Sequence, residues 1–252
     1  MKTYEHHQTL FYFKLKVFEK LFITRLQSIL QSIQILPDHQ FGFRRKHSTI
    51  EQIHRITNII HRALENKQYC TAAFLDISQA FDKVWHEGLL YKRHTFLPDS
   101  MYRILQSYLT NRYFRTKYRE VYSSIRPILA GVPQGSVLGL LLYLIYTADL
   151  PTLVNSTTAT FADDTAVLTV HEDPTMAAHR LQMHLNKIQS WLQIWRMKAN
   201  KAKSVQVTFT LNKMTCPSVK LNNDHLPQAD EVKYLGIHLD LRLTWRTHIT
   251  TK

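Results

Sequence analysis

The chain has 252 residues, 44% hydrophobic and 20% charged, which is the composition of a folded soluble protein with room for a core in one or two domains. Its 32 lysines and arginines outnumber 19 acids, giving a formal charge of +13 and a pI near 9.7. A pI this high is typical of nucleic-acid binders. Charge alone does not decide function, because a merely basic soluble protein has the same balance.

The sequence favours an intracellular location, in the cytoplasm or nucleus, and no association with membranes. The N-terminus lacks the apolar core of a signal peptide. The most apolar stretch, Val137 to Tyr146, is far shorter than the roughly 20 residues that a spanning helix needs. Cys70 and Cys216 lack zinc-binding spacing and are expected to be free thiols in a reducing compartment.

Helical and strand-like patterns alternate along the chain. Apolar residues recur at helical spacing from Lys14 to Ile33, which predicts a helix ending near Pro37, and a second helix is expected after a cap at Ser48 or Thr49. The later patterns predict, in order, a strand at 69–77, a helix or loop at 85–96, a helix at 99–109, strands within 113–128, a helix after 136, a hairpin at 157–170, a helix from Pro174, and strands at 204–210 and 232–239. Strands interleaved with helices favour an α/β or α+β protein.

Two adjacent acids, Asp163 and Asp164, interrupt an apolar strand-like run. Aspartate is depleted in strands, so a hairpin with the pair at its tip is expected. Asp76 ends another apolar run upstream. Three carboxylates at strand ends can hold two divalent metal ions, the arrangement that polymerases use for phosphoryl transfer. The simpler alternative is an ordinary turn, where aspartate is common.

The order of motifs is more specific than any one of them. A turn-rich loop, Gly131 to Ser136, lies between Asp76 and the acid pair, and Lys201 to Ser204 enters a strand after it. With the stretches 41–52, 75–86, 131–139, 161–167 and 232–237, the sequence resembles the reverse transcriptases of jockey-like non-LTR retrotransposons of insects.

This resemblance implies an α+β fold, a right-hand polymerase palm with partial fingers. Residues 1–68 correspond to partial fingers and 69–252 to the palm, with a finger insertion at about 85–130. The palm would end at a strand around Tyr234 to Gly236 that resembles the primer grip, or is a plain edge strand. Intact family members have an endonuclease domain upstream and more sequence downstream, so we expect a truncated chain with most of the thumb missing.

The resemblance also implies RNA-directed DNA polymerase activity, in which dNTPs are added to a DNA primer on an RNA template with two Mg²⁺ ions, or Mn²⁺ in their place. Asp76 and Asp163 would ligate the metals, and Asp164 belongs to the catalytic pair as a ligand or a supporting acid. Lys203 matches a lysine that protonates the leaving pyrophosphate; a surface lysine is the alternative.

Four further residues match nucleotide-binding positions of the family. Arg44 lies in a segment over the triphosphate. Phe81 matches the aromatic residue that excludes a 2′-hydroxyl, although its spacing alone favours a core residue. Gln134 and Gly135 lie beside the nucleotide and template, or simply form a turn. The oligomeric state stays open.

Two alternatives remain. In the first alternative, the chain is a catalytically dead retrotransposon remnant that acts at most as a nucleic-acid-binding module. Its truncated ends and Leu140, where the family usually has proline, favour this interpretation. A group II intron or telomerase enzyme is the other, and the Asp163 motif and the Trp85–His86 continuation argue against it.

Overall fold

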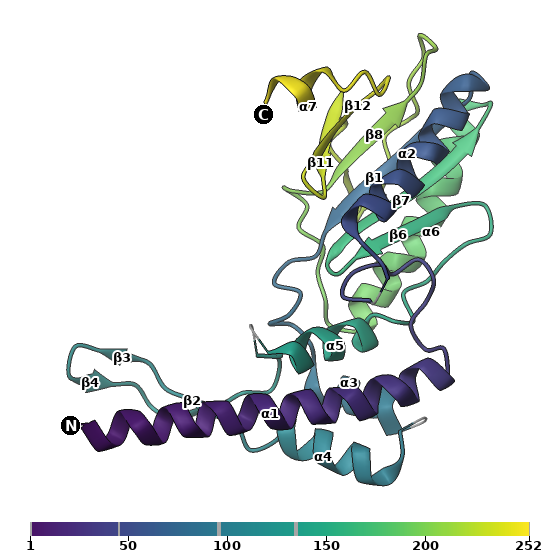
Figure 1. Cartoon of the computed structure of the whole chain (residues 1–252). Coiled ribbons are helices and arrows are strands. Elements are labelled where there is room, and N and C mark those ends of the chain that lie inside the picture. Colours follow the sequence, from purple (N-terminus) through teal and green to yellow (C-terminus); the bar gives the residue numbers. More distant parts are fainter. Residues whose placement is uncertain (1, 45, 95–96, 134–135, 252) are drawn as a thin grey trace. The chain divides into compact units, whose positions relative to one another are not determined.

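The computed structural model describes residues 2–44, 46–94, 97–133 and 136–251 (Figure 1). The chain forms two compact units that interleave along the sequence. Unit 1 comprises Met1–Pro37 and Gln79–Ala148, and unit 2 comprises Asp38–Ser78 and Asp149–Lys252.

Unit 1 is built from helices. They are α1 (Lys2–Ser32), α3 (His86–His94), α4 (Asp99–Leu109) and α5 (Val137–Tyr146). The C-terminal half of α1 buries Phe22, Leu26 and Leu30 and packs on α5, which is almost entirely apolar and almost entirely buried. Because α5 has ten residues and is enclosed by protein, its hydrophobicity is that of a core helix, as the sequence predicted.

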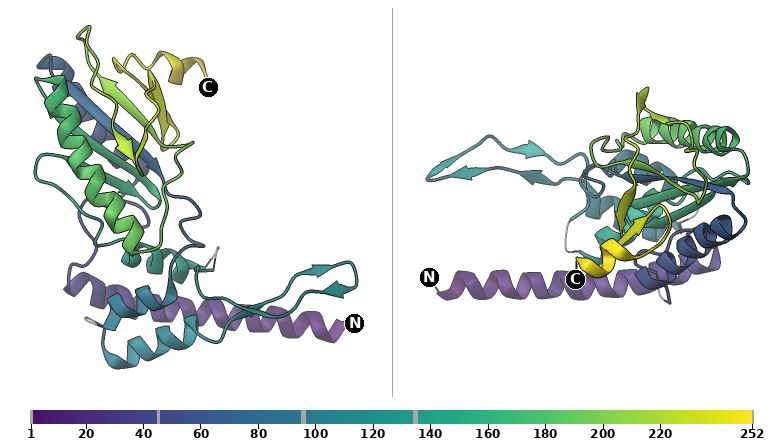
Figure 2. Two further views of the ribbon diagram at one scale, coloured as in Figure 1. Left: turned by 180° about the vertical axis from the view of Figure 1, so that it is seen from behind. Right: turned by 90° about the horizontal axis from the view of Figure 1, so that it is seen from above.

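A long hairpin with four short strands belongs to the same unit. Its outward strands are β2 (Tyr113–Phe114) and β3 (Lys117–Tyr118), and its return strands are β4 (Val121–Tyr122) and β5 (Arg126–Pro127). β2 pairs with β5, and β3 pairs with β4, both antiparallel. The hairpin projects as a two-stranded ribbon from the helices of unit 1 (Figure 2).

Unit 2 is organised by a four-stranded antiparallel sheet in the order β6-β7-β1-β8. The strands are β1 (Tyr69–Asp76), β6 (Thr157–Phe161), β7 (Asp164–His171) and β8 (Val205–Phe209). β1 is buried along seven of its eight residues, because it has a strand on each side and a helix over each face.

The two covering helices use alternate side chains of the strands. α2 (Thr49–Glu65) packs Ile56 and Ile60 against the face that carries Phe74 and Leu168. α6 (Pro174–Ile194) covers the opposite face, where the Thr169 hydroxyl donates to the Ala177 carbonyl at 2.8 Å. The strand period of two therefore separates two apolar layers. Figure 1 shows α2 and α6 on opposite faces of the sheet.

Helix caps account for the starts of these helices. Ser48 accepts from the Glu51 N–H at 3.2 Å, and the Glu51 carboxylate accepts from the Ser48 N–H at 2.7 Å, a complete capping box. This confirms Ser48, rather than Thr49, as the cap. Asp173 caps α6 ahead of Pro174, which favours the first helical position.

The C-terminal part of unit 2 corrects one expectation. Residues 232–239 form not one strand but a hairpin of β11 (Glu231–Tyr234) and β12 (Ile237–Asp240), because Leu235 and Gly236 both have positive φ, 46° and 85°. Tyr234 packs against Phe74 in the α2 layer. The remaining elements are β9 (Lys220–Leu221), β10 (Asp224–His225) and α7 (Arg246–Thr250).

Neither cysteine forms a disulfide. Cys70 and Cys216 are free thiols, and both are buried. Burial raises the pKa of Cys216 to about 11, so that the thiol stays protonated at neutral pH. Across the described ranges, no helix has the length and apolar character to cross a membrane.

Candidate active site

The two adjacent acids lie at the turn between β6 and β7. Phe161 and Asp164 form the last cross-strand pair, so Ala162 and Asp163 make a two-residue turn. Ala162 has φ of 58°, in the left-handed region that a residue with a Cβ rarely adopts. The tight turn that the sequence predicted is therefore present, with Asp163 in the turn and Asp164 opening β7.

Asp76 lies beside this turn because β1 pairs with β7 over its whole length. Asp76 is directly opposite Asp164 in the register. Facing side chains of an antiparallel pair lie on the same side of the sheet, with Cβ atoms roughly 4.5–5.5 Å apart. The fold thus brings together residues that are 88 positions apart in the sequence.

The three carboxylates influence one another electrostatically. Desolvation by the surrounding protein raises the pKa of Asp164, and the negative charges of Asp163 and Asp76 raise it further. Within the part of the chain that the structure describes, no three acidic, histidine or cysteine side chains are arranged so that they could hold a metal ion. The oxygen donors and their mutual repulsion nonetheless suit a hard divalent cation, which such a cluster attracts.

The segment before β8 holds the end of β1. The Asn200 N–H donates to the Asp76 carbonyl at 2.7 Å, and the Asp76 N–H donates to the Ser204 hydroxyl at 3.2 Å. The same segment carries Lys203, whose Nζ lies 3.9 Å from the Asp76 carboxylate. Both side chains of this ion pair reach solvent, so it contributes at most about 1 kcal/mol to stability.

Gln40 holds the acid turn from the other side, a role that sequence reasoning missed. Its buried side-chain carbonyl accepts from the N–H of Ala162 at 3.1 Å and from the N–H of Gly42 at 2.8 Å. A Cβ on Gly42 would lie 2.3 Å from the Ala162 nitrogen. Only glycine permits this approach between the loop and the turn.

A second buried glutamine anchors the same loop. The Gln52 side-chain amide donates to the carbonyls of Thr160 and His39, at 3.0 and 3.2 Å. The Thr160 N–H donates to the His39 carbonyl at 3.0 Å, and the Phe41 N–H donates to the Thr160 carbonyl at 2.9 Å. The loop therefore pairs with β6 through an isolated parallel bridge between Gln40 and Thr160 and fixes the turn that carries Asp163.

Arg44 lies in this loop. Its guanidinium donates to the Gln40 carbonyl at 3.2 Å. Partial burial lowers the pKa of nearby His39 to about 4, and the positive charges of Arg55 and Arg44 contribute to the shift. Two arginines, Arg44 of this loop and Arg55 of α2, therefore lie close to His39.

The other nucleotide-binding candidates belong to unit 1 or lie outside the described residues. The Phe81 ring packs on Tyr143 with centroids 4.7 Å apart, and its carbonyl accepts from the Val132 N–H at 2.9 Å. Gly131, at φ of 96°, closes against the backbone of Asp82. Gln134 and Gly135 are outside the described ranges.

The residue after this loop is held by a buried acid. Ser136 caps α5 by accepting from the Gly139 N–H at 3.1 Å. Its hydroxyl donates to Glu19 of α1 at 2.8 Å, and the Tyr108 hydroxyl donates to the same carboxylate oxygen at 3.1 Å. Three helices of unit 1 therefore meet at one hydrogen-bonded cluster.

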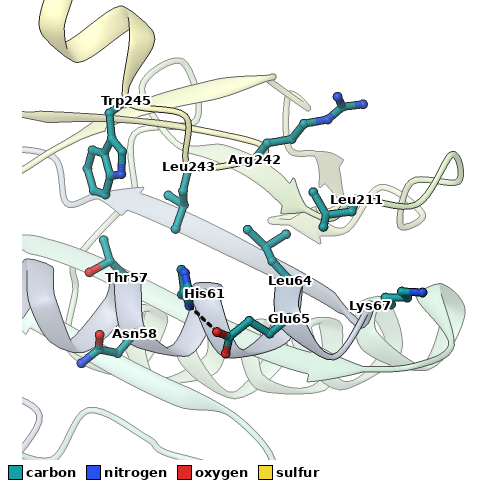
Figure 3. A pocket seen from close by; sticks show the side chains of 10 residues that line it. All are labelled: Thr57, Asn58, His61, Leu64, Glu65, Lys67, Leu211, Arg242, Leu243 and Trp245. Atoms are coloured by element: carbon teal, nitrogen blue, oxygen red, sulfur yellow. Dashed lines mark ion pairs between the residues drawn. The ribbon is translucent and has the colours of Figure 1, made fainter.

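A hollow of about 630 Å³ in unit 2 lies between α2 and the segment after β12 (Figure 3). Leu64 and Trp245 line it, together with His61, which forms an ion pair with Glu65 at 3.3 Å. None of the candidate catalytic acids lines this hollow. It is therefore distinct from the acid cluster.

The chain is similar to a known protein family and to proteins of mobile elements. Residues 4–239 match the family described as reverse transcriptase (RNA-dependent DNA polymerase). The chain is 44% identical to the RNA-directed DNA polymerase from mobile element jockey of Drosophila melanogaster and 42% identical to that of Drosophila funebris. These alignments cover 93% and 94% of this chain but only 26% and 27% of the relatives, so the chain spans about a quarter of their length.

Solved structures show the same fold at low identity. Telomerase from Candida tropicalis, in a complex with the TWJ fragment of telomeric RNA, matches with a TM-score of 0.65 at 14% identity. The match covers 97% of this chain and 39% of that one. Apo telomerase from the same organism, truncated from its C-terminal domain, matches with a TM-score of 0.62 at 13% identity, covering 97% and 47%. The α+β polymerase fold predicted from the sequence is confirmed.

Proposed function

Because the chain belongs to the reverse transcriptase (RNA-dependent DNA polymerase) family, we propose that it is the polymerase core of a jockey-like mobile element and extends a DNA primer on an RNA template. The observation that carries the proposal is that Asp76, Asp163 and Asp164 lie together where β1 ends and β7 begins. The hydrogen bonds that hold both strand ends favour a preorganised site over an incidental acidic surface.

The three aspartates would hold two Mg²⁺ ions, or Mn²⁺ in their place. Bound there, the ions would supply activation of the primer 3′-hydroxyl and charge neutralisation at the triphosphate. The elevated pKa of Asp164 supports this assignment, since a cluster whose carboxylates repel one another gains most from a cation. Asp76 and Asp163 remain our first choice as ligands, with Asp164 as ligand or support.

Lys203 is proposed as the proton donor to the leaving pyrophosphate. Its ammonium group is 3.9 Å from the Asp76 carboxylate, which supports a place at the reaction centre rather than at an unrelated surface. An ammonium so close to the acids also offsets part of their negative charge until substrate enters.

The nucleotide-binding roles follow from family membership. Arg44 would contact the triphosphate, because one guanidinium group can donate two parallel hydrogen bonds to phosphate oxygens. Phe81 would sense the sugar, and Gln134 and Gly135 would lie beside the incoming dNTP and template. These assignments define the substrates as an RNA template, a DNA primer and dNTPs.

The test is primer extension on an RNA template by the purified chain, with Mg²⁺ and dNTPs. Asp163→Asn removes one charge at the turn, and Asp230→Asn removes the same charge at an exposed position outside the acid cluster, as the control. We expect extension by the wild type and the control and none by Asp163→Asn. Equal extension by both variants would refute the metal role. A folded wild-type chain that binds template-primer without extending it would instead identify a non-catalytic remnant.

A further inference from the structure

The hairpin of unit 1 exposes all of its side chains. Every residue from Tyr113 to Pro127 is exposed, including Tyr118 and Val121, each at 72% of its full surface. An isolated two-stranded ribbon has marginal stability in water, and exposed aromatic groups add nothing to a core. Contiguous exposed apolar surface is instead typical of an interaction site.

Backbone hydrogen bonds, rather than packing, hold the ribbon together. The Ile128 N–H donates to the Arg112 carbonyl at 2.8 Å. Farther out, the Ser123 N–H donates to the Thr116 carbonyl, and the Thr116 N–H donates to the Ser123 hydroxyl, both at 2.9 Å. Between these two rungs the return strand has one more residue than the outward strand, which is the signature of a β-bulge. Apart from Ser123, whose hydroxyl joins the two strands, the exposed side chains can contact a partner.

The charge of the ribbon is strongly one-sided. Only one acid, Glu120, lies between residues 112 and 128, at the tip, where it is 3.5 Å from the Lys117 ammonium. The cations of the ribbon are Arg112, Arg115, Lys117, Arg119 and Arg126. A ribbon with this balance attracts a polyanion.

Aromatic rings are interleaved with these cations. The Arg115 guanidinium lies 4.1 Å from the centroid of the Tyr122 ring, and the Lys117 ammonium lies 5.5 Å from the same centroid. At the tip, the Arg119 guanidinium lies 5.4 Å from the Tyr118 ring. Cation–π contacts restrict the rings while leaving them exposed. Proteins bind single-stranded nucleic acid with the same combination, in which cationic side chains contact the phosphates and bases stack on exposed aromatic rings.

We propose that the hairpin from Arg112 to Ile128 is a binding arm for single-stranded nucleic acid. A protein partner fits less well, because five cations face a single acid along the ribbon and the cores of protein interfaces are depleted of charged residues. An anionic membrane would satisfy the charge but has no bases to stack on the rings. This proposal rests on the proposed function, because reverse transcription supplies a single-stranded template for the arm to bind. Nucleic-acid binding by the arm requires no incorporation of nucleotides.

The test is a fluorescence anisotropy titration of a labelled 30-nucleotide RNA with the full chain, over a series of salt concentrations. The charge variant combines Arg115→Gln, Lys117→Gln and Arg119→Gln. Its matched control removes three exposed lysines of unit 2 by Lys187→Gln, Lys213→Gln and Lys220→Gln. We expect the charge variant to lower the slope of log affinity against log salt by about 2, from roughly 0.7 per lost phosphate contact, and the control to lower it by clearly less.

A second variant tests the rings. Tyr118→Ala with Tyr122→Ala leaves the net charge unchanged and is expected to weaken RNA binding about tenfold, with little effect on a duplex of the same sequence. Because these side chains are exposed, thermal melting should be that of the wild type. Equal RNA binding by the hairpin variants and the control would overturn the proposal, as would loss of binding to phosphatidylserine vesicles without loss of RNA binding. Failed primer extension with normal RNA titrations would count against the proposed activity and not against the arm.

Discussion

Replacing Gln40 by methionine should loosen the turn that carries Asp163. Methionine has nearly the same length, so it fills the space but removes the carbonyl that accepts from the N–H groups of Ala162 and Gly42. Each buried donor left without an acceptor costs about 1–3 kcal/mol, so the expected loss in free energy of unfolding is about 2–6 kcal/mol. Gln40→Glu keeps an acceptor oxygen and should recover part of this loss.

The measurement is urea unfolding followed by tryptophan fluorescence in a Trp85→Phe background. Of the four tryptophans, only Trp85 belongs to unit 1, so the remaining three report on unit 2. Primer extension by the same proteins gives a second readout. The reasoning is refuted if Gln40→Met unfolds within about 0.5 kcal/mol of the parent, the usual range for surface substitutions.

Three other substitutions test neighbouring features. Asp164→Asn should raise the melting temperature in the absence of divalent metal, because the raised pKa of Asp164 means that its charged form destabilises the fold at neutral pH. Mg²⁺ should stabilise the wild type more than the variant. Thermal unfolding with and without Mg²⁺ measures both effects. Gly42→Ala should destabilise unit 2 by about 1–3 kcal/mol through its overlap with the Ala162 nitrogen, and a melting point equal to the wild type would contradict the close approach. His39 has a pKa of about 4 in the folded chain and about 6.5 when unfolded, so it contributes stability above pH 6.5 that decreases as the pH falls toward 4. In His39→Gln the free energy of unfolding should depend less on pH between 6.5 and 4. Urea unfolding midpoints at several pH values measure this dependence.

Local patterns predicted the elements that position the acids. Alternation and apolar runs predicted the β1 strand and the β6–β7 hairpin, since a strand buried on both faces needs a continuous apolar sequence. A cap at Ser48 or Thr49 indicated the start of α2, and the structure places it at Ser48. The hairpin at Leu235 and Gly236 was predicted as one strand because apolar residues recur from Val232 to Leu239. The apolar positions change from even to odd numbers at Leu235, and this change, together with Gly236, was the available signal for a turn.

The support around the acids was beyond sequence reasoning. Gln40 and Gln52 look like ordinary polar residues, and their roles depend on a carbonyl and an N–H about 110–120 residues away. No local propensity marks a side chain whose partner is supplied by tertiary structure. The ion pair of Lys203 with Asp76 has the same origin, because the turn before β8 brings the lysine there.

The place of β1 in its sheet has a consequence for biosynthesis. β1 is a central strand, but its neighbours β7 and β8 follow it by about 95 and 135 residues. At roughly 5–20 residues per second, the ribosome would need several seconds to tens of seconds to supply both neighbours. During that time an apolar strand with two unpaired edges would be exposed, which is the template on which chains aggregate. The yield of folded protein should therefore depend on chaperones that shield residues 69–76 of the nascent chain.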